Sequence, residues 1–399
     1  MKKLVIPFLI LLLLTQLCGC VGGEVAPTQD PAGGSTAQPE QSPPPTATPE
    51  PAAPRFAVTG DLYQEDFFDE DGETLLLHAA DDLPVVTVLG DQAASDAINA
   101  QLAARRETFL HAPSEYETGV DSAVEEARLI RQEGYTGESF ALEQYYTVQR
   151  GDSAVLSFCL RQYSYLGGPH PNQVFLGRSF DAAGRLLSLD DLSADPAGFR
   201  DFCTQKVAAL AEKDAGDGRY YEDYQTLLPA NIRDDMWYFS QAGLTFLYNA
   251  YDIGSYAAGP FEFTIPYAEL QGVMDARWLP IEIEANGDMT CADAENLTGV
   301  QPLLSLETDA EGSALVFTAR GTVQNVSLYA AADLGGEVAE NLPLVYLGRM
   351  ADGECFTLRY LFPGDASCLS LRYTGAGGEQ IARLVQLSGE DGSVLLLEP

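Results

Sequence analysis

Residues 164–173, SYLGGPHPNQ, place one of only three histidines in a turn rich in glycine and proline. His170 stands between Pro169 and Pro171, whose fixed φ angles reduce the entropy lost when the turn is ordered. A histidine held in this way can carry a proton near neutral pH or contact a ligand. The alternative is structural: the imidazole hydrogen-bonds the backbone and shapes the turn. We expect a rigid turn that serves recognition, and its candidate binding residues are Gly167, Gly168 and His170.

The chain lacks the patterns of common catalytic centres. It contains no Gly-x-Ser-x-Gly elbow, no His-Glu-x-x-His motif, no Cys-x-x-Cys pair and no phosphate-binding glycine loop. We therefore expect a protein that is not an enzyme and that uses no metal or other cofactor. Because carboxylates are abundant, a cell-wall polymer hydrolase that uses His170 or a carboxylate pair stays as the alternative hypothesis. The acidic turn 69–72 matches a calcium loop only in part, and a hairpin tip is the favoured interpretation.

Tyrosines offer a better functional lead, because many of them fall between residues 145 and 256. Tyrosine gives a large amphipathic contact area at small entropic cost. Most of these tyrosines fit half-buried sheet positions, whereas those in the loops at 220–224 and 251–256 could anchor a partner. The candidate binding residues of the second loop are Tyr251, Tyr256 and Gly259. If the loops 167–171 and 251–260 converge, they form one recognition surface.

The segment 144–275 contains the elements that must position both loops. Apolar alternation predicts strands at Val155–Tyr165 and Val174–Phe180, on either side of the histidine turn. A helix capped by Asp195 follows. Its predicted buried stripe consists of Phe199, Cys203, Val207 and Leu210. Further strands are expected at Trp237–Phe239, Leu244–Tyr248 and Phe261–Ile265.

The flanking segments differ in pattern. Residues 56–143 predict a hairpin around the acidic turn, a helix opened by Asp91 and a second helix opened by a Ser122–Glu125 capping box. Residues 276–399 show short β runs separated by turn residues, typical of a sandwich. The expected fold class is α+β: a mixed hairpin-and-helix domain pair followed by an all-β sandwich-like domain. Within the last domain a disulfide between Cys355 and Cys368 is one option.

The first twenty residues predict an exported and anchored protein. A basic start and the short apolar run Leu4–Leu14 are followed by Leu17-Cys18-Gly19-Cys20, which resembles a bacterial lipobox. This signal peptide, residues 1–20, predicts lipidation of Cys20, with ordinary secretory cleavage as the alternative. Residues 21–55 are rich in proline, alanine and threonine, which is typical of a disordered tether. We expect a protein lipid-anchored to the cell membrane and facing outside the cytoplasm.

The formal net charge of −37 restricts the partners. A phosphate backbone would be repelled, so no nucleic acid is expected to bind. A cationic protein would be steered inward, although the charge also serves solubility.

Several motifs between residues 57 and 275 follow one another in the order of a known family. The GGPHP turn between two strands, the DAAGRLLSLDDL turn, a helix and then YAAGPFEFTIPYAEL resemble the extracytoplasmic domain pair of RsiV-like anti-sigma factors and PdaC-type peptidoglycan deacetylases. Since RsiV is a lysozyme receptor, the resemblance implies a lysozyme-like cationic protein or a peptidoglycan fragment as the partner. Family members usually carry a small residue and a glycine around the histidine, where this chain has Pro169 and Pro171.

Two departures separate the chain from these families. In RsiV-like proteins a cytoplasmic sigma-binding segment and a membrane-spanning helix stand where this chain has its lipoprotein signal. PdaC-type enzymes append a metal-dependent deacetylase domain that needs paired histidines, and only His78, His111 and His170 are present here. We therefore expect a non-catalytic surface lipoprotein that binds a partner at the cell envelope.

Overall fold

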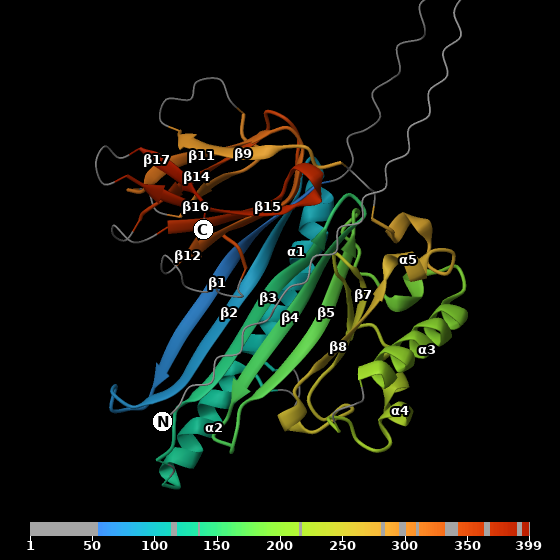
Figure 1. Cartoon of the computed structure of the whole chain (residues 1–399). Helices are drawn as coiled ribbons and strands as arrows, with labels where there is room; N and C mark the ends of the chain where they lie inside the picture. Colours follow the sequence, from blue (N-terminus) through green and yellow to red (C-terminus); the bar gives the residue numbers. More distant parts are fainter. Residues whose placement is uncertain are drawn as a thin grey trace, which may run out of the picture. The chain divides into compact units, whose positions relative to one another are not determined.

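The computed structural model describes ten stretches of the chain, and residues 52–399 form one compact unit (Figure 1). The described stretches are 55–112, 118–134, 136–214, 218–280, 284–294, 301–308, 311–331, 342–362, 368–388 and 393–398. The predicted signal peptide, Cys20 and the tether up to residue 54 lie outside them. The described elements confirm the α+β class, because helices accompany three separate sheets.

The largest sheet has ten strands in the order β17-β16-β15-β12-β13-β1-β2-β3-β4-β5. Its first five strands in the chain are β1 (Phe56–Phe68), β2 (Leu75–Val88), β3 (Phe140–Gly151), β4 (Val155–Tyr165) and β5 (Asn172–Asp181). Its remaining strands are β12 (Val323–Ala331), β13 (Val345–Met350), β15 (Cys368–Thr374), β16 (Gln380–Leu387) and β17 (Val394–Leu397). Strands of all three predicted folded segments therefore belong to this one sheet, in which β1 pairs with both β2 and β13. The domain boundaries at 143/144 and 275/276 stay predictions.

The predicted hairpin is confirmed, and both strands are longer than the sequence signals suggested. β1 and β2 pair antiparallel along their whole length, with a register shift only near Phe67 and Phe68. β2 then pairs parallel with β3, and a parallel neighbour requires a long crossover connection. That crossover carries α1 (Gln92–Leu110) and α2 (Val120–Gln132).

The crossover helices begin with different caps. Asp91 caps α1 as predicted, since its carboxylate accepts a hydrogen bond from the Ala94 amide at 3.0 Å. The start of α2 was predicted wrongly: the N-cap is Gly119, three residues before Ser122. The Ser122 hydroxyl accepts from the Gly119 amide at 3.1 Å, so it closes the first turn in the way predicted for Glu125.

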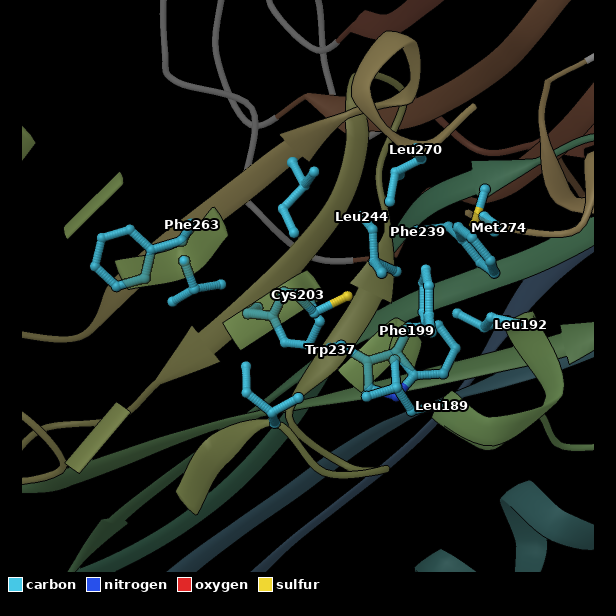
Figure 2. Packing of buried hydrophobic residues seen from close by; sticks show 14 of the residues in the cluster. Leu189, Leu192, Phe199, Cys203, Trp237, Phe239, Leu244, Phe263, Leu270 and Met274 are labelled. Atoms are coloured by element: carbon cyan, nitrogen blue, oxygen red, sulfur yellow. The ribbon is translucent and has the colours of Figure 1, made fainter. Parts of the chain in front are cut away.

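Helix α3 (Pro196–Asp214) packs against the three-stranded sheet of β6 (Trp237–Phe239), β7 (Gly243–Tyr248) and β8 (Phe261–Pro266). Figure 2 shows Phe199 and Cys203 of α3 among Trp237, Leu244 and Phe263 of these strands. Leu210 is only partly buried, and Ala211 takes its predicted place in the stripe. Short helical turns surround this core: η1 (Leu189–Leu192), α4 (Tyr224–Leu227), η3 (Leu228–Asn231), η4 (Tyr256–Ala258), α5 (Tyr267–Leu270) and η5 (Ala276–Trp278).

The C-terminal segment has a sandwich-like core. Its second sheet has the order β10-β14-β11-β9, and apolar side chains of this sheet and of β12, β13, β15 and β16 form one buried cluster. These strands are β9 (Asp288–Asp293), β10 (Ser305–Glu307), β11 (Ser313–Arg320) and β14 (Cys355–Tyr360), and η6 (Ala376–Gly378) joins β15 to β16.

The disulfide option between Cys355 and Cys368 is wrong. Cys355 is a free thiol on β14, whereas Cys368 begins β15 in another sheet. Cys159, Cys203 and Cys291 are also free.

Two kinds of feature are absent from the described stretches. None of their helices has both the length and the apolar character needed to cross a membrane. Nor do they contain a group of three or more histidine, cysteine, aspartate or glutamate side chains placed to hold a metal ion.

Candidate functional site

The two loops singled out in the sequence converge. The His170 ring stacks on the Tyr256 ring with centroids 3.8 Å apart and an interplanar angle of 19°. Tyr251 completes the group, because its ring lies 6.0 Å from that of Tyr256 and its hydroxyl lies 3.4 Å from His170 Nε2. Tyr251 is 54% exposed. We call His170, Tyr251 and Tyr256 the aromatic cluster.

Unusual backbone conformations turn both loops toward each other. Gly167 has φ 77° and Gly259 has φ 78°, a region that residues with a Cβ rarely adopt. Tyr251 adopts φ 74° although it is not glycine, which costs on the order of 1 kcal/mol or more. Its amide donates to the Gly254 carbonyl at 3.0 Å, and this turn holds the strained residue in place. Gly168 lies in the same turn as His170, and a Cβ atom added there would meet only the His170 carbonyl oxygen, 3.8 Å away.

Asn249 joins the loop that carries Tyr251 to β5, the strand that follows the histidine turn. This residue was not among the predicted site residues. Its side-chain oxygen accepts from the Phe175 amide at 2.7 Å, and its side-chain nitrogen donates to the Phe175 carbonyl at 3.2 Å. The amide therefore replaces a neighbouring strand at the edge of β5. An Asn directly after an apolar strand and before a glycine-bearing loop was the available signal, since such residues often bond to backbone.

In the neutral imidazole, the hydrogen bonds of His170 select one tautomer. Nδ1 lies 2.9 Å from the Pro171 carbonyl oxygen, which can only accept, so Nδ1 carries the proton. Nε2 is left as the acceptor for the Tyr251 hydroxyl. Within the described residues His170 has no hydrogen bond to a carboxylate, serine or cysteine. The arrangement suits a contact surface, since the two polar contacts of the ring go to a backbone carbonyl and to an exposed tyrosine.

The sheet beside the cluster continues this surface. Side chains alternate across a strand, so Glu143, Tyr145, Arg161 and Tyr163 lie on the face opposite the one that Leu142 and Tyr146 bury. The Arg161 guanidinium lies 5.3 Å from the Tyr145 ring centroid, in cation–π contact. Burial raises the pKa of Tyr163, and the charges of Glu143 and Tyr256 raise it further, so Tyr163 interacts electrostatically with a member of the cluster.

The loop at 220–224, which was also predicted to anchor a partner, does not join this surface. Tyr220 stacks on Tyr224 at 4.8 Å and contacts Phe261 at 4.7 Å, and both tyrosines pack against the core around α3. The Tyr220 hydroxyl donates to Asp214 at 2.7 Å. These contacts explain the half-burial of Tyr220 and Tyr224 without a partner.

The most buried carboxylate of the long hairpin is engaged with a cation. Asp81 is 0% exposed and accepts from Arg106 Nε at 2.7 Å and from Gln144 Nε2 at 3.0 Å. Arg106 also pairs with Asp61 at 2.7 Å. This hydrogen-bonded ion pair holds β1, β2, β3 and α1 together.

Comparison with known proteins identifies part of the chain. Residues 201–268 match the profile of the family DUF3298, described as a protein of unknown function. The matched segment contains Tyr251, Tyr256 and Gly259, whereas His170 precedes it. A comparison with curated proteins returned no match.

Two solved structures of the DUF3298 family are similar to this chain. The crystal structure of a member from Bacteroides fragilis NCTC 9343 has 19% identity and a TM-score of 0.44, covering 56% of this chain and 96% of that one. The crystal structure of a member from Pseudomonas aeruginosa PAO1 has 16% identity and a TM-score of 0.39, covering 56% of this chain and 97% of that one.

Proposed function

We propose that the protein is a non-catalytic lipoprotein that docks a cationic partner at the outer side of the cell membrane through the aromatic cluster. The observation that carries this proposal is the convergence of two distant loops into an exposed group of stacked rings. Aromatic rings at the surface give a large contact area for little loss of side-chain entropy. Three such rings held by glycine turns and by Asn249 are already ordered before a partner arrives.

Charge supports a cationic partner. The net charge of −37 attracts cationic proteins over a distance and raises their association rate at low salt. Exposed tyrosine faces then attract arginine or lysine side chains, and the fold itself uses this contact between Arg161 and Tyr145. The resemblance to RsiV-like proteins favours a lysozyme-like muramidase, with a peptidoglycan fragment as the second ligand class. The lipobox at Cys20 supports the membrane anchor.

Calorimetry of the purified full chain with lysozyme tests the proposal. We expect binding at roughly 0.02 M salt that weakens at roughly 0.15 M, because the Debye length shortens. The double variant Tyr251→Ala/Tyr256→Ala should bind at least about tenfold more weakly, as for an interface hot spot. The matched control is Tyr360→Ala, which removes a tyrosine from the aromatic pair with Phe362 outside the cluster and should bind like the wild type.

Each result distinguishes a different failure. No binding at either salt concentration would remove lysozyme as the ligand. Binding that survives the double variant and is lost in Tyr360→Ala would move the docking surface to the C-terminal sandwich-like region. Cell-wall digestion by the wild type that His170→Ala abolishes would favour the hydrolase instead.

A further inference from the structure

A cavity of about 320 Å³ lies between α1 and the face of β3, β4 and β5 that carries Leu142 and Gln162. Arg105 and Phe109 line it from α1, where residues four apart lie on the same side of the helix. Leu142, Gln162, Ser164 and Val174 line it from the strands. This volume falls at the lower end of the range of about 300–1,000 Å³ for small-molecule sites.

Arg105 is the unusual member of this lining. Its Nε atom is buried and has no hydrogen-bond partner, and no ion pair joins its guanidinium to a carboxylate in the described stretches. Leaving a buried polar group unpaired destabilises a fold, and more so when the group is charged. In a chain with 59 acidic and 22 basic residues, an arginine without an acidic partner is unexpected.

A second guanidinium lies close to Arg105. Burial lowers the pKa of Arg178, and the like charge of Arg105 lowers it further, while Asp235 opposes the shift. The hydrogen bond that Arg178 donates goes to the Gly177 carbonyl, which is neutral. One acidic residue, Glu143, also lines the cavity, and its side chain belongs to the strand face opposite Leu142 and Gln162. The wall that carries Leu142 and Gln162 therefore contains the Arg105 cation and no acidic side chain among the described lining residues.

We propose that this cavity binds a small organic carboxylate, whose anionic group pairs with the Arg105 guanidinium and whose apolar body packs between Phe109, Leu142 and Val174. The guanidinium matches a carboxylate in two parallel hydrogen bonds. Apolar walls with one charged group select an amphipathic anion over an inorganic one. The cavity borders the surface that continues the aromatic cluster, because Glu143 and Tyr163 also line it.

Equilibrium binding of sodium benzoate to the full chain tests the proposal, with benzamide as the uncharged probe of the same shape. We expect benzoate to bind and benzamide to bind about tenfold more weakly or not at all. Arg105→Gln should reduce benzoate binding by about tenfold or more. Arg277→Gln is the matched control: it removes the same charge from a site that is 60% exposed and paired with Asp275, and it should bind benzoate like the wild type.

A second variant covers the case in which Arg105→Gln does not fold. Val174→Phe keeps Arg105 and fills the cavity from β5, and it should also abolish benzoate binding. Equal binding of benzoate and benzamide would overturn the proposal, since the charge would then play no part. A folded Arg105→Gln that binds benzoate like the wild type would overturn it as well, and so would unchanged binding to a folded Val174→Phe.

Discussion

At the scale of single residues, Asp82 shows how the fold changes a side chain's chemistry. Burial raises the pKa of Asp82 to about 6, a hydrogen bond from the Leu342 backbone opposes the rise, and the charge of Asp81 adds to it. Arg106 lowers this pKa and Asp61 raises it, and both effects are smaller. The ordinary value of 3.8 applies to the unfolded chain. Between the two values, the folded protein binds a proton that the unfolded chain has lost.

This difference predicts a pH-dependent effect of Asp82→Asn. The folded-state pKa is raised, so the wild type gains stability as the pH falls from above 6 toward 4, and ionised Asp82 opposes folding above pH 6. The variant should therefore be more stable than the wild type by about 1–2 kcal/mol at pH 8, with little difference near pH 4. Urea unfolding of both proteins at the two pH values measures this. A gain of the same size at both values would contradict the argument.

Asp71 provides a control of opposite sign. Hydrogen bonds from Thr74 and Glu73 lower the pKa of Asp71 at the hairpin tip, the side-chain bond from Thr74 most of all. Its stabilising contribution is present above the unfolded pKa and is lost as the pH falls through the folded value. Asp71→Asn should consequently lower the stability at pH 8, where Asp82→Asn raises it.

At the scale of elements, Asn249 joins the loop after β7 to the edge of β5. Asn249→Ala removes both hydrogen bonds to Phe175 and frees the loop that carries Tyr251. We expect the Phe175 amide to exchange with solvent about tenfold or more faster, because a net hydrogen bond of about 1 kcal/mol or more is lost locally. Lysozyme binding should weaken as well, since the loop is no longer ordered beforehand.

The same strand contains the internal control. The Gly177 amide donates to the Asp235 carbonyl at 2.8 Å, two residues along β5, and does not involve Asn249. Its exchange rate should stay unchanged in Asn249→Ala. Faster exchange at both amides would mean that the whole edge of β5 loosens, which would contradict a local role for Asn249.

Elements with clear periodicity could be predicted from the sequence, and those with buried polar residues could not. β4 was predicted with its bounds because Leu156, Phe158 and Leu160 alternate with polar residues. β3 was missed because Gln144 and Arg150 occupy buried positions that the pattern requires to be apolar. Gln144 is accommodated there by donating a hydrogen bond to Asp81, 63 residues away in the chain, and by accepting one from Gln162.

At the scale of the whole molecule, the candidate residues were predictable and their assembly was not. Glycine, proline and tyrosine signals marked the loops of the aromatic cluster, but nothing local indicates that Tyr256 stacks on His170. The Arg105 cavity depends in the same way on where α1 packs. The ten-stranded sheet depends on β1 pairing with β13 at Ala57–Leu347 and Val58–Tyr346, a contact between residues almost 290 positions apart. Such pairings follow from packing of the complete chain.

The joint between β1 and β13 couples the C-terminal strands to the rest of the molecule. Ala57 belongs to the buried cluster of the sandwich-like region, whereas Tyr346 of β13 belongs to the cluster beneath α1. The Tyr346 hydroxyl lies 3.1 Å from the Gly151 carbonyl oxygen and 3.0 Å from Asn325 Oδ1. Gly348 packs so closely that a Cβ atom there would lie 2.2 Å from the Gly151 carbonyl oxygen.

This coupling predicts a single cooperative unfolding transition. The chain has two tryptophans, Trp237 and Trp278, and both lie in the core around α3, so fluorescence reports that core alone. Far-UV circular dichroism reports all sheets, and in urea the two signals should change together.

In Gly348→Val the added side chain separates the joint, and the circular dichroism transition should begin at lower urea than the fluorescence transition. Leu371→Ala, which costs about 2–5 kcal/mol in the sandwich-like core with the joint intact, should shift both signals together. Separate midpoints in the wild type would mean that a continuous sheet does not make these regions fold as one.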